Sequence, residues 1–473
     1  MLQISQEDVV NRLDFDNPWW TNPTAGLEEP YTGMPERSYL EPFLTLVNDR
    51  SVRRAVILMG PRRVGKTVIL QQTIQKLIQA GASATSIMFL SLETPIYTGV
   101  GLEKFVLMFQ KKFGHARATP LTIIFDEIQY LNQWEVHLKS LVDSFSNIRF
   151  IASGSAAAAL RLKSRESGAG RFTEFLLPPL TFAEYLRFIG KETELISNAK
   201  ATDINALNAE FVEYLNIGGY PEAVFNDAIR HDSGRYIKSD IVDKVLLRDL
   251  PQIYGIRDTQ ELNRLFTTLA YNTGNEVSLD ELSKNSGVSK TTLNRYMEYL
   301  EAAFLIKRIY RIDQNAKRFQ RATSFKVYLT NPSMRAALFG NVDSEDKSMG
   351  ALAETALFAQ WFHDPDMIEN IHYARWSSGE IDMVAVSPET QKPLWCVEVK
   401  WTDRPTKDHK LLRHLVSFWA KNAEIKTCKV TTKTVEVKTE ISGRAIDFMP
   451  TSLLVYVVGK NVLERIEGRY KDE

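Results

Sequence analysis

A glycine-bounded loop that ends in a lysine and a threonine is the part of this sequence best suited to chemistry. It reads Gly60-Pro61-Arg62-Arg63-Val64-Gly65-Lys66-Thr67, and Val68 follows it. The backbone N–H groups of such a loop turn inward, and the positive end of the next helix faces the same point, so that together they form an anion site. Lys66 would reach the β- and γ-phosphates of a nucleotide, and Thr67 would place its hydroxyl on Mg²⁺. The alternative is a glycine-rich turn without a ligand.

Two adjacent carboxylates form a second motif. Residues 121–127 read Leu-Thr-Ile-Ile-Phe-Asp-Glu, an apolar run that ends in two acids. Asp126 would complete the Mg²⁺ shell, and Glu127 would orient or deprotonate the attacking water. Alone, this motif could be a core strand that ends in a solvated turn. Together with the preceding loop it predicts hydrolysis of a nucleoside triphosphate. The absence of an Asn/Thr-Lys-x-Asp motif for guanine favours ATP over GTP.

A third group of chemically capable residues lies toward the C-terminus. Asp382 follows Glu-Ile, and Glu398 and Lys400 belong to the run Val-Glu-Val-Lys. The two-residue period of a strand sends Glu398 and Lys400 to one face, where Asp382 on a neighbouring strand can join them. With Glu354 from a nearby apolar helix, this group could bind one or two Mg²⁺ ions and activate a water for phosphodiester cleavage. An edge strand with solvated charges would give the same spacing.

A basic segment stands out in a chain whose charges balance. The whole sequence has 58 Lys and Arg against 58 Asp and Glu, but residues 281–326 have ten of the former and four of the latter. A helix-turn-helix pattern with Ser289 as N-cap, followed by apolar stretches at 304–310 and 325–329, predicts a winged helix. Such a domain binds DNA, but it can equally serve as a protein contact or as an ATPase lid. The residues expected to meet DNA phosphates are Lys290, Arg295, Lys307, Arg308 and Arg311.

The elements that must position the first two motifs follow a repeated strand–helix pattern. Continuous apolar strands separated by helices predict an α/β fold with a parallel sheet between helices. Ligands of such sheets bind at the carboxyl ends of the strands, where both motifs fall. The strands are expected at residues 55–59, 86–91, 121–126, 148–153 and 172–177.

Composition restricts the cellular compartment in which the protein is expected to work. Two cysteines, Cys396 and Cys428, are too few for a disulfide framework. The sequence has no apolar run long enough for a membrane span and no signal-peptide pattern at its start. We therefore expect a cytoplasmic protein that does not contact membranes.

Taken together, these motifs resemble a family of bacterial and archaeal predicted ATPases of the AAA+ superfamily. The C-terminal domain of that family has no characterised function and is similar to the PD-(D/E)xK restriction-endonuclease fold. Besides the motifs above, the resemblance rests on residues 17–20 (Asn-Pro-Trp-Trp), 126–129 with Trp134, 153–155, 167–171, 218–221 and 244–249.

The resemblance implies a domain order and further site residues. Ser153 corresponds to sensor-1, Arg171 (or else Arg165 or Arg161) to an arginine finger, and Pro221 to an element that packs against adenine. The domains implied are an N-terminal lead (1–50), an AAA+ P-loop ATPase core (51–180), a helical lid (181–257), a winged helix (258–340) and a PD-(D/E)xK nuclease-like domain (350–473).

The sequence thus predicts an ATP- and Mg²⁺-dependent AAA+ ATPase that acts on DNA, for example branched or foreign DNA, with a Mg²⁺-dependent nuclease activity left open. An arginine finger that acts on a neighbouring subunit implies a homo-oligomer, for which a hexamer is one option. The alternative is a nucleotide-controlled switch or protein scaffold whose nuclease-like domain is an inactive binding module.

Overall fold

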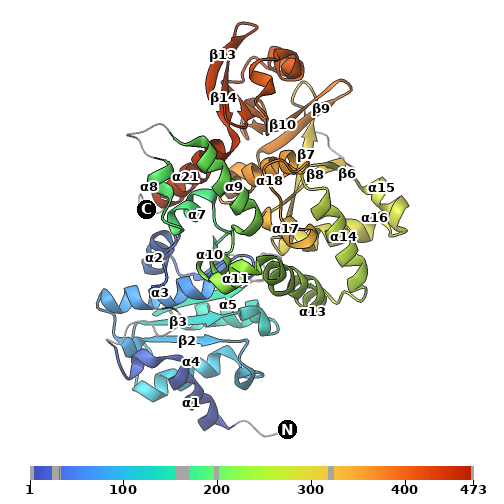
Figure 1. The fold of residues 1–473 in the computed structure, drawn as a ribbon. Helices are drawn as coiled ribbons and strands as arrows, with labels where there is room; N and C mark the ends of the chain where they lie inside the picture. The colour runs from blue at the N-terminus through green and yellow to red at the C-terminus, as the bar shows by residue number, and fades with distance from the viewer. Residues whose placement is uncertain are drawn as a thin grey trace. The chain divides into compact units, whose positions relative to one another are not determined.

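The structure is a computed structural model that describes residues 5–23, 31, 33–154, 170–196, 202–317 and 324–469. The chain divides into two compact units (Figure 1). The first comprises Met1–Pro178 with Arg465–Glu473, and the second comprises Pro179–Glu464. Among the described residues, no helix is both long and apolar enough to cross a membrane.

In the first unit, the described residues form a five-stranded sheet in the order β2-β3-β4-β1-β5, and all of its pairings are parallel. The strands β1, β3 and β4 are buried at every position, which explains their continuous apolar sequences. Helix α3 covers one face of the sheet and α4 the other (Figure 1). The predicted parallel α/β sheet is therefore confirmed. The strands are β1 (Ala55–Met59), β2 (Ile87–Ser91), β3 (Leu121–Asp126), β4 (Ile148–Gly154) and β5 (Phe172–Leu176). The helices are α1 (Gln6–Asp16), α2 (Leu40–Asn48), α3 (Lys66–Gln79), α4 (Leu102–Phe113) and α5 (Trp134–Ser144).

The N-terminal lead covers the outer edge of β2, the first strand of this sheet. The side-chain amide of Asn17 pairs with the backbone of Phe89 as a neighbouring strand would: Nδ2 donates to the carbonyl at 2.8 Å, and Oδ1 accepts from the N–H at 2.6 Å. The indole N–H groups of Trp19 and Trp20 both donate to the carbonyl of Ile87. The two tryptophans thus hold the N-terminal lead against β2.

In the second unit, the described residues form a nine-stranded mixed sheet in the order β13-β14-β12-β11-β10-β9-β7-β8-β6. β7 and β8 are the strands expected for the wing, and β7 pairs in parallel with β9 through Arg311 and Tyr373. The sheet therefore continues from the predicted winged helix into the predicted nuclease-like domain, and the boundary between those two domains stays a prediction. The strands are β6 (Glu276–Ser278), β7 (Ile306–Ile312), β8 (Ser324–Leu329), β9 (Ile371–Trp376), β10 (Gly379–Val386), β11 (Pro393–Glu398), β12 (Thr427–Thr432), β13 (Val437–Ile441) and β14 (Arg444–Pro450).

The helices of the second unit lie before, between and after the strands of this sheet in the chain. Ser289 caps α16 by accepting from the N–H of Thr292, as expected for a helix-turn-helix. The two cysteines, Cys396 and Cys428, are buried free thiols on the neighbouring strands β11 and β12. The helices before β6 are α7 (Phe182–Phe188), α8 (Glu192–Leu195), α9 (Ile204–Ile217), α10 (Pro221–Phe225), α11 (Asp227–His231), α12 (Ser233–Tyr236), two π-helical segments (Ile237–Asp243 and Val245–Asp249), α13 (Leu250–Tyr254) and α14 (Thr259–Tyr271). The later ones are α15 (Leu279–Ser286), α16 (Lys290–Ala302), α17 (Ser333–Phe339), α18 (Met349–Trp361), α19 (Pro365–Ile368), α20 (Arg413–Lys421) and α21 (Thr451–Arg469).

Candidate functional site

The glycine-bounded loop connects the carboxyl end of β1 to the first turn of α3. Gly60 must be a glycine because a Cβ there would lie 2.1 Å from the carbonyl oxygen of Leu177. Gly65 has a φ of 94°, in the left-handed region that favours glycine, and it directly precedes the helix. The loop thus delivers its chain to the N-terminus of a 14-residue helix, where unpaired N–H groups attract anions.

Lys66 and Arg37 fix the charge and shape of this loop. Lys66 is buried, and its Nζ donates to the carbonyl oxygens of Gly60 at 3.1 Å and Pro61 at 2.8 Å. Its ammonium therefore lies over the loop, where a phosphate would bind. The buried guanidinium of Arg37 donates to the carbonyl oxygen of Val64 from Nη1 at 3.2 Å, and so supports the loop. The remaining predicted members are Arg62, Arg63 and Val68, of which Arg63 is exposed and has a φ of 63°.

The two predicted carboxylates and Ser153 meet the loop at the ends of β3 and β4. Thr67 Oγ1 donates to Asp126 Oδ2 at 2.9 Å, and Ser153 Oγ donates to Asp126 Oδ1. The same Ser153 oxygen accepts from the backbone N–H of Glu127 at 3.1 Å. Glu127 has a φ of 53°, an uncommon left-handed conformation for a glutamate, and accepts from the side-chain amide of Gln129. One hydroxyl therefore holds both acidic residues in place.

Asp126 is buried, and its surroundings shift its protonation. Burial, with the charge of Glu127 as the next cause, raises the pKa of Asp126 to about 6. Hydrogen bonds from Ser153 and Thr67 oppose this rise. A hydroxyl and a carboxylate in contact beside a phosphate-binding loop are the donor set that Mg²⁺ takes in P-loop enzymes, so these residues fit the expected ATP and Mg²⁺.

Arg171 lies at the amino end of β5, an outer strand of the same sheet. It immediately precedes β5, and its carbonyl accepts from the N–H of Ala55 at the start of β1. Its Nε donates to Asp143, and this bond lowers the pKa of the Asp143 carboxyl. The alternatives, Arg161 and Arg165, lie outside the described residues. The assignment of an arginine finger stays a prediction, as does an adenine contact by Pro221, which begins α10 in the second unit.

The carboxylate cluster predicted near the C-terminus forms around Asp382. Lys400 Nζ lies 2.7 Å from Glu398 Oε1 and 3.6 Å from Asp382 Oδ2, and the same Asp382 oxygen accepts from the N–H of Val399 at 2.8 Å. Glu354 reaches the cluster from the buried helix α18. The structure therefore brings together all four residues that the spacing predicts.

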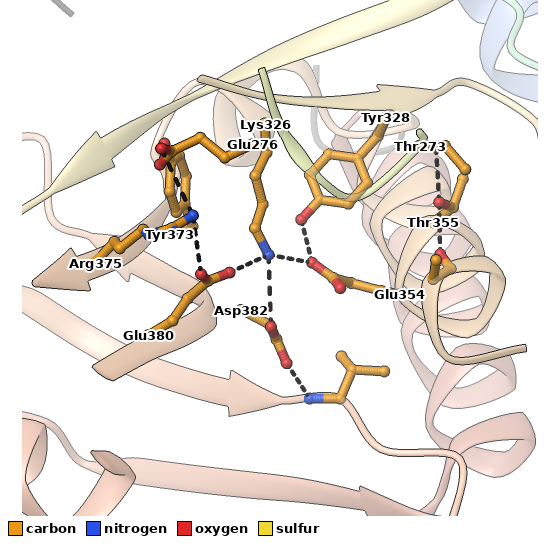
Figure 2. A network of polar contacts seen from close by, with 12 residues as sticks. Thr273, Glu276, Lys326, Tyr328, Glu354, Thr355, Tyr373, Arg375, Glu380 and Asp382 are labelled. Atoms are coloured by element: carbon orange, nitrogen blue, oxygen red, sulfur yellow. Dashed lines mark hydrogen bonds and ion pairs between the residues drawn. The ribbon is translucent and has the colours of Figure 1, made fainter. Parts of the chain in front are cut away.

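A second lysine, which the sequence did not predict, lies inside this cluster. Figure 2 shows Lys326 of β8 pointing at three carboxylates. Its Nζ lies 2.8 Å from Glu354 Oε1, 2.7 Å from Glu380 Oε1 and 3.5 Å from Asp382 Oδ1. Tyr328, two residues along the same strand, donates its hydroxyl to Glu354. The sequence feature that could have pointed to both residues is their two-residue spacing, which places them on one face of a mostly apolar strand.

Burial and neighbouring charges shift the pKa values of the acids in this cluster in different directions. Burial, then the charge of Asp382, raises the pKa of Glu354 to about 7 and that of Glu398 to about 8. For Asp382, burial acts in the same direction, but the charges of Lys400 and Lys326 prevail and lower its pKa. Glu398 Oε2 is buried and has no hydrogen-bond partner in the described part of the chain.

The cluster as arranged differs from the expected metal site. Within the described ranges, no group of three or more His, Cys, Asp or Glu side chains is placed so that it could hold a metal ion. The physical reason is that the acids face ammonium groups: both oxygens of Asp382 are near a lysine, Oδ1 near Lys326 and Oδ2 near Lys400.

The residues predicted to contact DNA fall into different environments. Arg295 is exposed on α16. Lys290 is exposed at the first position of α16 and pairs with Asp280. Lys307 pairs with Glu369 at 2.6 Å, and Arg311 is half-buried.

Arg308 requires a correction. Its side chain is only 9% exposed, and its guanidinium donates to Glu301 Oε2 from both Nε and Nη2, at 2.9 and 2.7 Å. Nη1 donates to Asn294 at 2.8 Å. Because these bonds occupy the guanidinium inside the domain, Arg308 is not placed to meet a phosphate.

Comparisons with known proteins agree with the fold of the first unit. Residues 52–186 match the model of a family described as an AAA domain, and residues 208–345 match that of a domain of unknown function, DUF8612. An uncharacterized protein of Haemophilus influenzae is 27% identical over 292 residues, which are 60% of this chain and 69% of that protein. An uncharacterized protein of Methanocaldococcus jannaschii, MJ1544, is 24% identical over 358 residues, 74% of this chain and 76% of that protein.

Among solved structures, the replication initiator DnaA bound to AMPPCP and single-stranded DNA is 15% identical, with a TM-score of 0.29 over 59% of this chain and 92% of that chain. A TM-score this low supports no conclusion about function. The AAA domain match, the parallel sheet and the phosphate-binding loop agree on an AAA-type ATPase fold for the first unit. The winged helix and the nuclease-like domain stay predictions.

Proposed function

We propose that this protein binds and hydrolyses ATP and couples the cycle to an action on DNA, such as the processing of branched or foreign DNA. The observation that carries the ATPase part is the contact of Thr67 and Ser153 with Asp126, beside Glu127 and the phosphate-binding loop. These are the residue types that P-loop hydrolases use, and they converge at the carboxyl ends of β3 and β4.

Each residue of this site has a distinct task in the proposed reaction. The loop N–H groups and Lys66 bind the phosphates, and Thr67 with Asp126 would hold Mg²⁺, which neutralises phosphate charge when bound. Glu127 orients or deprotonates the attacking water. Ser153 keeps both acids in position, because it bonds to the carboxylate of Asp126 and to the backbone of Glu127.

The DNA part of the proposal is supported by the excess of positive charge on residues 281–326 and by the exposed position of Arg295 and Lys290 on α16. Phosphate contacts of this kind depend on charge and not on base sequence. We further propose a homo-oligomer, in which Arg171 of one copy serves the nucleotide of the next.

The test is the rate of ATP hydrolysis with and without a panel of single-stranded, duplex and branched DNA. We expect hydrolysis by the wild-type protein and a several-fold stimulation by at least one DNA form. Lys66→Ala should abolish both, because it removes the charge that binds the phosphates. A wild-type protein without turnover would contradict the ATPase assignment, and turnover that no DNA changes would contradict the action on DNA.

A second candidate function is a nucleotide-controlled switch or scaffold whose last domain is an inactive binding module. The observation that favours it is the position of Lys326 among Glu354, Glu380 and Asp382. The two candidates differ in a cleavage assay with Mg²⁺ or Mn²⁺. Cleavage of any DNA form that Asp382→Ala abolishes would favour the nuclease, and intact DNA together with normal ATP turnover would favour the binding module.

A further inference from the structure

Lys326 is a buried cation on β8, the last strand but one of the nine-stranded sheet. Its side chain is only 3% exposed. Its strand, β8, has neighbours on both sides: Lys326 is in register with Glu276 of β6 and with Ile309 of β7. An ammonium group can be buried only if partners replace the water that it loses. The loss of one of its partners would therefore leave a buried charge without full compensation.

Those partners are carboxylates that come from two other elements. Glu354 belongs to α18, and Glu380 and Asp382 belong to β10, so that the ammonium joins three separate segments (Figure 2). An ammonium has three N–H donors, and each can face one of these acids. Three carboxylates around one ammonium supply the negative charge that a buried cation needs.

We propose that Lys326 is an internal cation that takes the place of a divalent metal in this cluster, so that the second unit holds Glu354, Glu380 and Asp382 together without Mg²⁺ or Mn²⁺. A metal ion would need these same oxygens at about 2.0–2.6 Å. The ammonium already contacts Glu354 at 2.8 Å and lies 3.5 Å from Asp382, and its charge repels a second cation.

Lys326 has no simple way to leave this position. Its backbone is held between two strands, so β8 cannot move without breaking pairs on both sides. If only the side chain rotated, the ammonium would lose all three carboxylates. The replacement of the metal is therefore a fixed property of the sheet. It is independent of the ATP site, which belongs to the first unit.

The test uses the full-length protein without nucleotide and Mn²⁺ as the probe, measured by calorimetric titration and by the shift of the unfolding temperature. Wild-type protein should show no Mn²⁺ binding that depends on Asp382. The variant K326Q/E380Q loses one charge of each sign. Glu380→Gln keeps the shape of its side chain and Lys326→Gln puts a shorter polar one in place of the lysine, so the variant should fold. It removes the ammonium from Glu354 and Asp382 while Lys400 stays paired with Glu398, and we expect it to bind Mn²⁺ at least tenfold more tightly than the wild type and to unfold at a higher temperature in its presence.

Two controls make the result specific. Adding Asp382→Asn to K326Q/E380Q should remove the gained Mn²⁺ binding, and Lys392→Gln, which alters an exposed lysine outside the cluster, should behave as the wild type. Wild-type binding of Mn²⁺ that Asp382→Asn abolishes would overturn the proposal. So would a folded K326Q/E380Q that binds no Mn²⁺. If K326Q/E380Q folds only when Mn²⁺ is present, that dependence supports the proposal. If it folds neither with nor without Mn²⁺, the proposal is overturned. The ATPase rate of each variant should equal that of the wild type, so a failure here is distinct from a failure of the ATPase proposal.

Discussion

At the scale of single residues, a substitution of Glu127 is expected to affect ATP turnover but not ATP binding. Glu127→Gln keeps the shape of the side chain and leaves Thr67 and Asp126 in contact, but an amide cannot take a proton from water. We expect this variant to bind ATP as the wild type does and to lose turnover by about 10²–10⁴-fold. Lys66→Ala should lose binding and turnover together. Fluorescent nucleotide binding and phosphate release would be measured on both, and normal turnover in Glu127→Gln would refute its role.

At the scale of elements, α16 and β7 present the basic residues on which DNA binding would depend. Lys290→Ala, Arg295→Ala and Lys307→Ala should each reduce the slope of log affinity against log salt by roughly one, because each removes one phosphate contact. Anisotropy titrations with labelled duplex over a salt series would measure this. Lys392→Ala, an exposed lysine on no predicted DNA surface, is the matched control. An unchanged slope in a variant that combines all three substitutions would reassign α16 and β7 to a lid or a protein contact.

The same elements show what a sequence can and cannot predict. The five strands and the loop of the first unit could be predicted because each strand is a local apolar run and the loop follows directly after one. Lys326 could not be assigned, because its partners lie 28 to 56 positions later in the chain and meet it only through the fold. The sequence places Arg308 among the surface charges, although its partner Glu301 is only seven residues earlier, because a basic residue on a strand gives no sign of which face it occupies.

At the scale of the whole molecule, the position of Arg171 requires a second copy if it acts as a finger. It precedes β5, whose five residues place it about 16 Å along the sheet from the strand ends that carry the ATP site. Arg171→Ala should lower turnover by about 10³–10⁵-fold with ATP affinity kept, and mixing with Lys66→Ala subunits should restore part of it.

Asp143→Ala is the matched control for this prediction. It breaks the ion pair of Arg171 but keeps the guanidinium, so turnover should be retained. Steady-state ATPase rates over a dilution series would complete the measurement. Full activity in a dilute monomer would show that no neighbouring subunit is needed.

The pairing of Asn17 with Phe89 has a practical consequence for handling the protein. β2 is the outermost strand of its sheet, and its backbone groups are covered by a side chain and two indoles from the N-terminal lead. An expression fragment that starts after Trp20 would leave those groups unpaired, and open strand edges recruit other chains. Such a fragment would be prone to aggregate even with its catalytic residues intact, so insolubility of the shortened protein would say nothing about the ATP site.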